Sequence, residues 1–485
     1  METQVNKQTS PEQDKLPREV VVVLSILVIS AMIMILNETI LSVALPSIMA
    51  DFQVPETTAQ WLTTGFMLTM AVVIPTTGFL LDRFSTKTIF VTAQLFFTVG
   101  TLVAALAPSF AILLIGRIIQ AVGTALVMPL LMTVTLTVVP AHRRGAMMGI
   151  ISIVISVAPA LGPTVSGFIL NSLTWHWLFW MMLPIVLIAL AVGTLLIKNI
   201  GENKISPLDV FSVVLSAIAF GGLVYGFSSI GAILNGEGTV GLVIIAIGLV
   251  SLAIFIWRQI QLGKQDRALM DLRPFKIRNF SFSLVAILLA FGAMLGTVMV
   301  LPIYLQNSLG VTALVTGLVV MPGGLLQGVV APFIGRFYDK VGPRPLLIPG
   351  AILLTAAAWA FSLLDGSSPV PMVVALHTVF SLGMCLMMTP LMTTALGSLP
   401  RTLYGHGSAI LNTLQQLAGA AGTAIMIAAL SFGTLLASNA GSAQAEAVAS
   451  GTRVAFIAGG IIAVMALVSS LFVTRVEEDI KENTK

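Results

Sequence analysis

Two residues of opposite charge, Glu38 and Arg117, lie inside apolar stretches long enough to cross a bilayer. Between residues 20 and 36 the only polar side chains are two serines, so Glu38 lies well along such a stretch. A charge at that depth costs about 2.5–3.5 kcal/mol on insertion scales and usually faces a cavity or a partner. Burial favours a protonated carboxyl group and a nearby arginine favours an ionised one, so small relative movements could exchange a proton. We therefore predict that Glu38 and Arg117 couple transport to protons.

Other roles for these residues stay open. Glu38 and Arg117 could form a permanent ion pair that only locks two helices together, or Glu38 could only bind substrate. Asn37-Glu38-Thr39 also fits the acceptor pattern for N-glycosylation, but that pattern requires a wet surface loop. A position inside a membrane span excludes it.

Several polar and aromatic side chains in the apolar segments are candidates for substrate contact. Arg117, Gln120 and Thr124 follow one another at i, i+3 and i+7, so they share one helix face, and Gln120 could bond Asn37. Interhelical hydrogen bonding is the alternative role for such amides, and membrane-boundary anchoring is the alternative for the aromatic residues. The substrate-binding candidates are Asn37, Gln60, Trp61, Phe66, Gln120, Met294, Met299, Tyr304, Gln306, Asn412, Gln415 and Gln416.

The composition indicates which elements must position these residues. Of the 485 residues, 57% are hydrophobic and 9% are charged, whereas roughly 25% of residues are charged in soluble domains. The chain is therefore an integral membrane protein, and its single cysteine, Cys385, excludes an intramolecular disulfide and a cysteine-based metal cluster. We predict fourteen membrane-spanning helices, each near the ~20 residues that a crossing needs. They lie at 20–44, 57–81, 88–107, 110–138, 145–171, 176–198, 208–228, 238–258, 281–304, 313–337, 344–364, 369–394, 406–436 and 452–475.

The basic residues set the predicted orientation. With fourteen spans and both termini in the cytoplasm, nearly all Lys and Arg fall in cytoplasmic loops and tails. The predicted organisation is a cytoplasmic N-terminal tail (1–19), an N-terminal six-helix bundle (20–200), a two-helix insertion with cytoplasmic loops (201–279), a C-terminal six-helix bundle (280–475) and a cytoplasmic C-terminal tail (476–485).

An internal repeat predicts a pair of gating contacts. "GFLLDRFSTKT" (78–88) and "GRFYDKVGPRP" (335–345) both read G-x-x-x-D-[RK] at the end of a predicted span. We expect the two aspartates to bond neighbouring helix ends on the cytoplasmic side and to act as latches for the outward-open state. A third segment, "APALGPTVSG" (158–167), combines prolines that remove helix donors with glycines that allow close packing. The predicted gating residues are Asp82, Arg83, Gly162, Pro163, Arg336 and Asp339.

These motifs resemble those of a known family. "GFLLDRFSTKT", "GRIIQAVGTA" (116–125) and "APALGPTVSG", together with "LNETILSVALP" and fourteen predicted helices, are similar to the fourteen-helix drug/proton antiporters of the major facilitator superfamily. The resemblance implies an all-α integral membrane protein with two six-helix bundles, two inserted helices and proton-driven export. This chain departs from the family pattern at three positions. Asn37 replaces the usual Asp, Ala121 replaces the Gly that follows the helical Gln, and Ser166 replaces the first of the paired glycines.

Other function classes lack their motifs. The sequence has no G-x-x-x-x-G-K-[ST] phosphate loop for an ATP-driven pump, no clustered histidines for an intramembrane enzyme, and no repeated channel filter. We expect a proton-coupled multidrug efflux antiporter that exports lipophilic, often cationic compounds by alternating access. A proton-coupled exporter of one amino acid, peptide or lipid-like metabolite is the alternative.

The expected setting follows from that function. We expect a multi-pass monomer in a bacterial-type plasma membrane. Its partners would be small-molecule substrates, protons and membrane lipids, without nucleic acid, and it would need neither a cofactor nor a metal, since the proton gradient supplies the energy.

Overall fold

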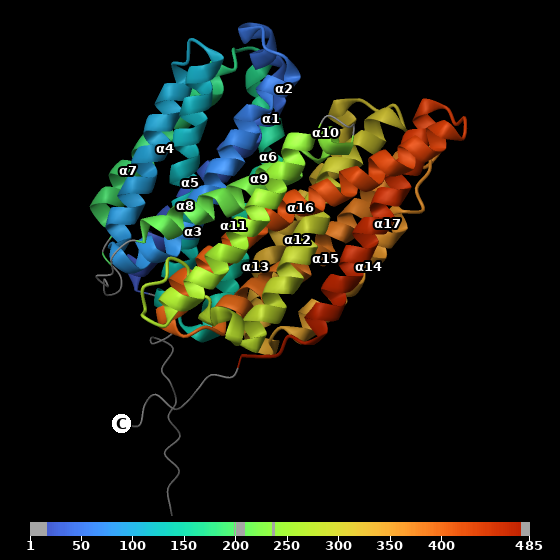
Figure 1. Ribbon diagram of the computed structural model, residues 1–485. Coiled ribbons are helices and arrows are strands. Elements are labelled where there is room, and N and C mark those ends of the chain that lie inside the picture. Colours follow the sequence, from blue (N-terminus) through green and yellow to red (C-terminus); the bar gives the residue numbers. More distant parts are fainter. Residues whose placement is uncertain (1–16, 198, 200–208, 235–237, 477–485) are drawn as a thin grey trace, which may run out of the picture.

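The computed structural model describes residues 17–197, 199, 209–234 and 238–476, and every regular element in this part is helical (Figure 1). Thirteen of its helices are long and apolar enough to cross a membrane. They match thirteen of the fourteen predicted spans. The remaining predicted span, 145–171, forms the 27-residue helix α6, in which several side chains are not described.

The first bundle is built from α1 and α3 to α7. Its helices are α1 (Arg18–Phe52), the short α2 (Glu56–Ala59), α3 (Trp61–Arg83), α4 (Thr86–Ala105), α5 (Phe110–Val138), a 3-10 turn (Ala141–Arg143), α6 (Arg144–Leu170) and α7 (His176–Leu196). Within it, α1 packs against α5, α6 and α7, and α4 packs against α5 and α7. Helix α1 therefore stands between α5 and α6.

The second bundle is built from α12 to α17. It comprises a 3-10 turn (Arg273–Lys276), α12 (Arg278–Asn307), α13 (Ala313–Val341), α14 (Arg344–Phe361), α15 (Val370–Gly397), a 3-10 turn (Arg401–Leu403), α16 (Tyr404–Asn439) and α17 (Gln444–Leu471). Helix α13 stops at Gly342, whose φ of 82° is readily adopted only by glycine. The Gly342 N–H donates to the Tyr338 carbonyl at 2.7 Å and closes the last turn.

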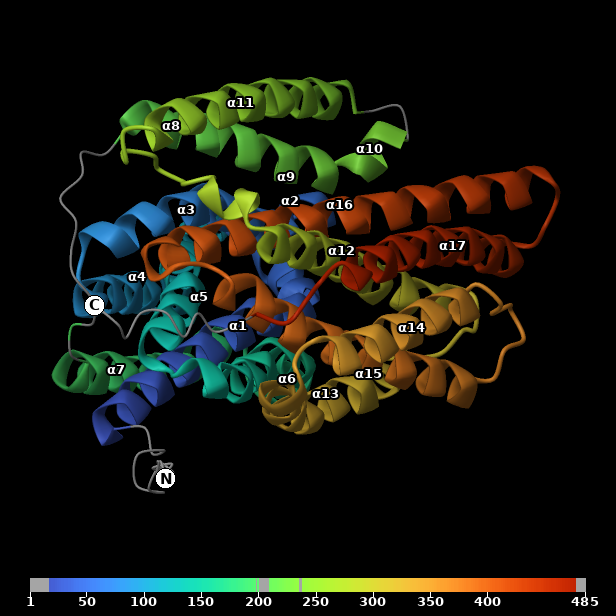
Figure 2. The same ribbon diagram turned by 90° about the horizontal axis from the view of Figure 1, so that it is seen from below.

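The two-helix insertion lies along the outside of both bundles (Figure 2). Its first span consists of α8 (Val210–Ser216), a π-helical turn (Ala217–Gly221), α9 (Gly222–Ser228) and α10 (Ile230–Leu234), and its second is α11 (Thr239–Gly263). The first span packs on α3 of the first bundle and on α16 of the second. Arg258 joins the two spans by donating to both Asp209 oxygens at 2.7 and 2.9 Å, and these bonds lower the Asp209 pKa to about 2.

The two bundles meet mainly through two helix pairs, α6 with α13 and α3 with α16, and α6 with α15 and α5 with α16 add smaller contacts. We call the side on which α1 begins and α17 ends the tail side; it is the lower side in Figure 1. The seam between α6 and α13 is very tight there, because a side chain on Gly149 would run into the Ala331 carbonyl at 2.5 Å. In this conformation the bundles are therefore closed against each other on the tail side.

Candidate functional site

Arg117 is the centre of a buried polar network between α1, α3, α4 and α5. Its side chain is 1% exposed, and its Nη1 donates to Asn37 Oδ1 at 2.7 Å and to Gln120 Oε1 at 3.0 Å. Gln120 Nε2 in turn donates to Thr101 Oγ1 at 2.8 Å. The guanidinium also lies 4.2 Å from the centre of the Phe66 ring, a cation–π contact. The arginine is thus fixed from several sides although no carboxylate bonds it directly in the described part.

Two glycines explain how α4 and α5 come close enough to build this network. A Cβ on Gly100 would lie 2.5 Å from the Gln120 backbone nitrogen, and a Cβ on Gly116 would lie 2.8 Å from the Ala104 nitrogen. Their missing side chains let the two backbones touch. The motif "GRIIQ" therefore supplies the close approach through its glycine and the polar side chains through Arg117 and Gln120.

Glu38 lies next to this network but interacts with it only at longer range. Arg117 is the charged group that interacts with it electrostatically, yet among the described residues Glu38 makes no hydrogen bond and no ion pair within 4 Å. The direct partner of Arg117 on α1 is Asn37. The Asn37 contact places this part of α1 beside Arg117 of α5.

The surroundings of Glu38 differ from those of its neighbours on the same helix face. Met34 and Leu41, at i−4 and i+3, share that face and are 1% and 2% exposed, whereas Glu38 itself is only half-buried. The opposite face of α1 carries Ile29, which is 55% exposed. Glu38 is therefore more exposed than Met34 and Leu41, the two residues that share its face of α1.

Helix α6 touches α1 directly beside this carboxyl group. Thr39 Oγ1 lies 3.5 Å from the Ala158 carbonyl, and a Cβ on Gly162 would collide with the Thr39 side chain. The glycine of "APALGPTVSG" thus permits α6 to pack one residue away from Glu38. The Pro163 side chain, the other predicted gating residue in this motif, lies outside the described part.

The other end of α6 carries one of the two predicted gating contacts. Asp339, at the end of α13, accepts hydrogen bonds from the backbone N–H groups of Gly145 and Ala146 at 2.7 and 2.8 Å. These donors belong to the first turn of α6, where unpaired N–H groups and the helix dipole favour an anion. We call this interaction the Asp339 latch. Gly145 and Gly335 allow it, because a Cβ on Gly145 would lie 2.5 Å from the Gly335 carbonyl and from Asp339 itself.

The second gating contact joins α3 to α16 on the same side, and we call it the Asp82 latch. Asp82 Oδ2 lies 3.3 Å from His406 Nε2, near the first turn of α16. His406 Nδ1 accepts the backbone N–H of Asp271 at 3.2 Å, which assigns the ring proton to Nε2 and makes it the donor to Asp82. A Cβ on Gly78 would lie 2.8 Å from His406 Nδ1, so the first glycine of the repeat makes room for this ring. Both aspartates of the repeat therefore bond helix ends across the seam between the bundles.

The remaining candidates lie apart from the Arg117 network. Trp61 packs on Tyr225 of α9 with ring centres 5.9 Å apart, and the buried Tyr304 donates its hydroxyl to the Asp365 carbonyl at 2.6 Å. Asn412 donates to the Ser408 carbonyl at 2.8 Å and approaches Met132 Sδ of α5 at 3.5 Å. Of the others, Gln60, Met299, Gln306 and Arg336 are exposed, whereas Arg83, Met294, Gln415 and Gln416 are half-buried.

Sequence reasoning missed two members of these sites. Thr101 completes the Arg117 network, but a single threonine in an apolar span gives no signal in the sequence. His406 was not among the predicted gating residues, although its partner Asp82 was. Two segments 324 residues apart meet here, and no local pattern indicates such a contact.

The amino-acid sequence is similar to those of known membrane transporters. A family model described as the Major Facilitator Superfamily matches residues 27–423. The lincomycin resistance protein LmrB of Listeria monocytogenes is 41% identical over 444 residues, which cover 90% of this chain and 93% of that protein. The multidrug resistance protein B homolog of Mycobacterium tuberculosis is 27% identical over 396 residues, 81% of this chain and 73% of that protein.

A solved structure has the same fold. The human organic anion transporter MFSD10 (TETRAN) superposes with a TM-score of 0.68 at 14% sequence identity and covers 94% of this chain and 100% of that one. At that identity the likeness concerns the arrangement of the helices and not the compound that is carried.

Proposed function

Because this chain belongs to the Major Facilitator Superfamily and is a multi-pass membrane transporter, we propose that it exports lipophilic, often cationic drugs in exchange for protons. The names of its relatives, lincomycin resistance protein and multidrug resistance protein, support drug efflux. One observation carries the proton coupling: the partly exposed Glu38 lies beside the buried Arg117, whose Nη1 bonds Asn37 and Gln120.

Glu38 is suited to binding either a proton or a substrate cation. Arg117 favours its ionised form and the loss of water favours its neutral form, so modest changes in its surroundings decide whether a proton stays. Arg117 is itself held by Asn37, Gln120 and Phe66. Glu38 has no such bonds among the described residues, so the carboxyl group remains available to exchange partners while the arginine stays in place.

Helix α6 offers a mechanical route from Glu38 to the Asp339 latch. One part of α6 packs on Thr39 through Gly162, and its first turn supplies the two amides that Asp339 accepts. The 17 residues between Gly145 and Gly162 span about 26 Å of helix. We infer that a change of charge at Glu38 alters the packing of α1 on α6 and thereby the closure of the tail side, which we expect to face the cytoplasm.

The free energy of proton entry is large enough to drive export without ATP. One proton entering through a potential of 100 mV supplies about 2.3 kcal/mol, and a pH gradient adds to this value. A substrate cation that competes with the proton for a single carboxyl group would make the exchange obligatory, since the two cannot occupy it together.

Proteoliposomes containing Glu38→Gln test the proposal. Under an imposed pH gradient, adding lincomycin or a lipophilic cationic dye should release protons from wild-type protein and not from Glu38→Gln, which should still bind the compound. Glu446→Gln is the matched control, because it makes the same chemical change at an exposed carboxyl group near the start of α17.

The outcomes separate the competing functions. Proton release from Glu38→Gln equal to that of wild type would refute the role of Glu38. Failure of every cationic compound to bind, together with proton-coupled export of one amino acid, peptide or lipid-like metabolite, would establish the dedicated exporter instead.

A further inference from the structure

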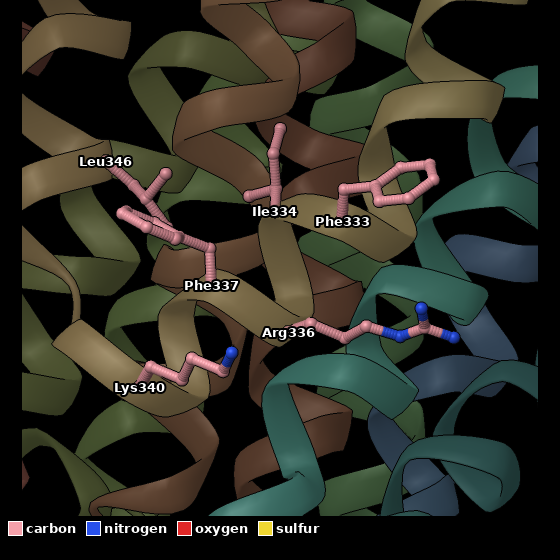
Figure 3. Close-up of a pocket in the computed structure, with 6 residues that line it drawn as sticks. All are labelled: Phe333, Ile334, Arg336, Phe337, Lys340 and Leu346. Carbon is pink, nitrogen blue, oxygen red and sulfur yellow. The ribbon is translucent and has the colours of Figure 1, made fainter.

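A groove on the outer surface of the second bundle lies beside the Asp339 latch. It has a volume of about 420 Å³ and is lined by Phe333, Ile334, Arg336, Phe337 and Lys340 of α13 and by Leu346 of α14 (Figure 3). That volume falls within the ~300–1,000 Å³ of typical ligand sites. Apart from Arg336, which the sequence predicted as a gating residue, the transport proposal gives the lining of this groove no role.

The groove combines an aromatic ridge with a basic ridge on one helix. Phe333 and Phe337 are spaced i, i+4, as are Arg336 and Lys340, so each pair forms a row along α13. All four side chains are exposed; Phe333 is 62% and Phe337 48% exposed. In Figure 3 Phe333 lies on the same side of Ile334 as Arg336, and Phe337 lies on the same side as Lys340. A ligand that fits both ridges must carry an apolar chain and an anionic group.

The charges around the groove are mostly positive. Neither Arg336 nor Lys340 has a hydrogen-bond or ion-pair partner within the described residues. Arg475, whose side chain lies against Gly342, adds positive charge close to the groove. Asp339 stands next to Lys340 in sequence, but its two oxygens accept the α6 amides. Three cations and one carboxylate therefore leave the end of α13 with a net positive charge.

From this arrangement we propose that the groove binds an anionic phospholipid of the leaflet on the tail side. The phosphate would lie between Arg336 and Lys340, and an acyl chain would run along Phe333 and Phe337 toward the bilayer centre. Basic pockets at this level of a membrane protein attract anionic headgroups, at about 1 kcal/mol for each Lys or Arg. An exposed aromatic ridge is the apolar surface that a lipid chain covers and that a soluble anion would leave wet.

All six lining residues belong to the second bundle, and this placement makes a second prediction. Opening of the Asp339 latch would leave the groove intact, so lipid binding should not depend on the transport cycle. Asp339→Asn, which weakens the latch, should bind the lipid as wild type does. The lipid proposal can therefore be refuted independently of the proposed transport function.

Native mass spectrometry of purified protein in detergent, titrated with phosphatidylglycerol or phosphatidylcholine, tests the site. We expect wild type to prefer phosphatidylglycerol, and the double variant Arg336→Gln/Lys340→Gln to lose about 30-fold in affinity, equivalent to about 1 kcal/mol for each cation. Lys264→Gln/Arg267→Gln is the matched control, because it removes two exposed cations after α11 and should keep the preference. Melting temperatures of both variants should equal that of wild type.

Three further measurements exclude other occupants. Glycerophosphoglycerol, the soluble headgroup, should bind far more weakly; equal affinity would show an anion site and overturn the lipid assignment. Phe337→Ala should weaken phosphatidylglycerol binding, and an unchanged affinity would contradict the acyl contact. If a preference for phosphatidylglycerol appears only after truncation behind Val476, the acidic C-terminal residues 477–485 are the natural occupant. The proposal also fails if the Arg336→Gln/Lys340→Gln variant keeps the preference.

Discussion

Replacing Gly335 by alanine should hold the bundles apart on the tail side. Gly335 lies on α13 where that helix touches the first turn of α6, and the contact is between backbones. A new Cβ would lie 2.7 Å from the Gly145 carbonyl carbon and closer still to its oxygen. Because carbon atoms pack at about 3.5–4.0 Å, the two helices must separate by about 1 Å to admit it.

That displacement is enough to break the Asp339 latch. The two bonds from the Gly145 and Ala146 amides measure 2.7 and 2.8 Å, so a shift of about 1 Å takes both beyond hydrogen-bonding distance. Bonds to a charged group contribute about 1.5–3 kcal/mol each. Losing both would disfavour the closed tail side by about 3–6 kcal/mol, which shifts the ratio of closed to open molecules by a factor on the order of 10² to 10⁴.

Electron spin resonance distances measure this shift. Spin labels on cysteines at Ala141 and Arg401, one on each bundle, in a Cys385→Ser background should move apart in Gly335→Ala, and efflux should stop. Gly317→Ala is the matched control on the same helix, because a Cβ there meets nothing within 4 Å. The reasoning is refuted if Gly335→Ala keeps both the wild-type distance and wild-type efflux.

Substitutions at three other positions test the remaining contacts. Arg117→Ala should abolish proton-coupled efflux, whereas Arg117→Lys should restore part of it in the same vesicle assay, because it returns the charge without the forked donor geometry. Asp82→Asn, which weakens the bond to His406, should lower the efflux rate while the melting temperature stays within about 3 °C of wild type; normal efflux would count against this latch. Asp209 has a pKa lowered to about 2 from 3.8, so its bond to Arg258 contributes stability that is fully present above pH ~4 and is lost only as the pH falls through about 2. Thermal unfolding of Asp209→Asn should therefore be shifted equally at pH 5 and pH 8, and a shift that appears only at the higher pH would contradict this assignment.

Much of the fold followed from the sequence, because bilayer thickness fixes the length of each apolar segment. The family and the all-helical architecture predicted from the motifs are confirmed by the family model and by the structural relatives. Boundaries were less accurate: α1 continues to Phe52, eight residues beyond the predicted end at residue 44, since Pro46 is accommodated inside the helix. The π-helical turn at Ala217–Gly221, which packs against α11 and α3, was not predicted.

The site followed from the sequence only in part. Glu38 and Arg117 stood out because charge is costly in hydrocarbon, and the structure brings their segments together. The sequence could not show that Arg117 bonds Asn37 rather than Glu38, since adjacent residues of α1 differ by 100° in direction and only the position of α5 decides between them. The roles of these residues in proton exchange stay predictions until the vesicle assays are done.

The two latches differ in how readily a substitution removes the hydrogen-bond donor of each. Asp339 accepts amide N–H groups of the backbone at Gly145 and Ala146. Any residue except proline at position 146 supplies the same donor, whereas a side chain at position 145 would collide with Asp339. Asp82 instead depends on one imidazole, that of His406, which a single nucleotide change can remove. In resistance variants selected under drug pressure, substitutions that change the closure of the tail side should therefore occur more often at the α3–α16 seam than at the α6–α13 seam. Natural sequence variation should be concentrated at position 406.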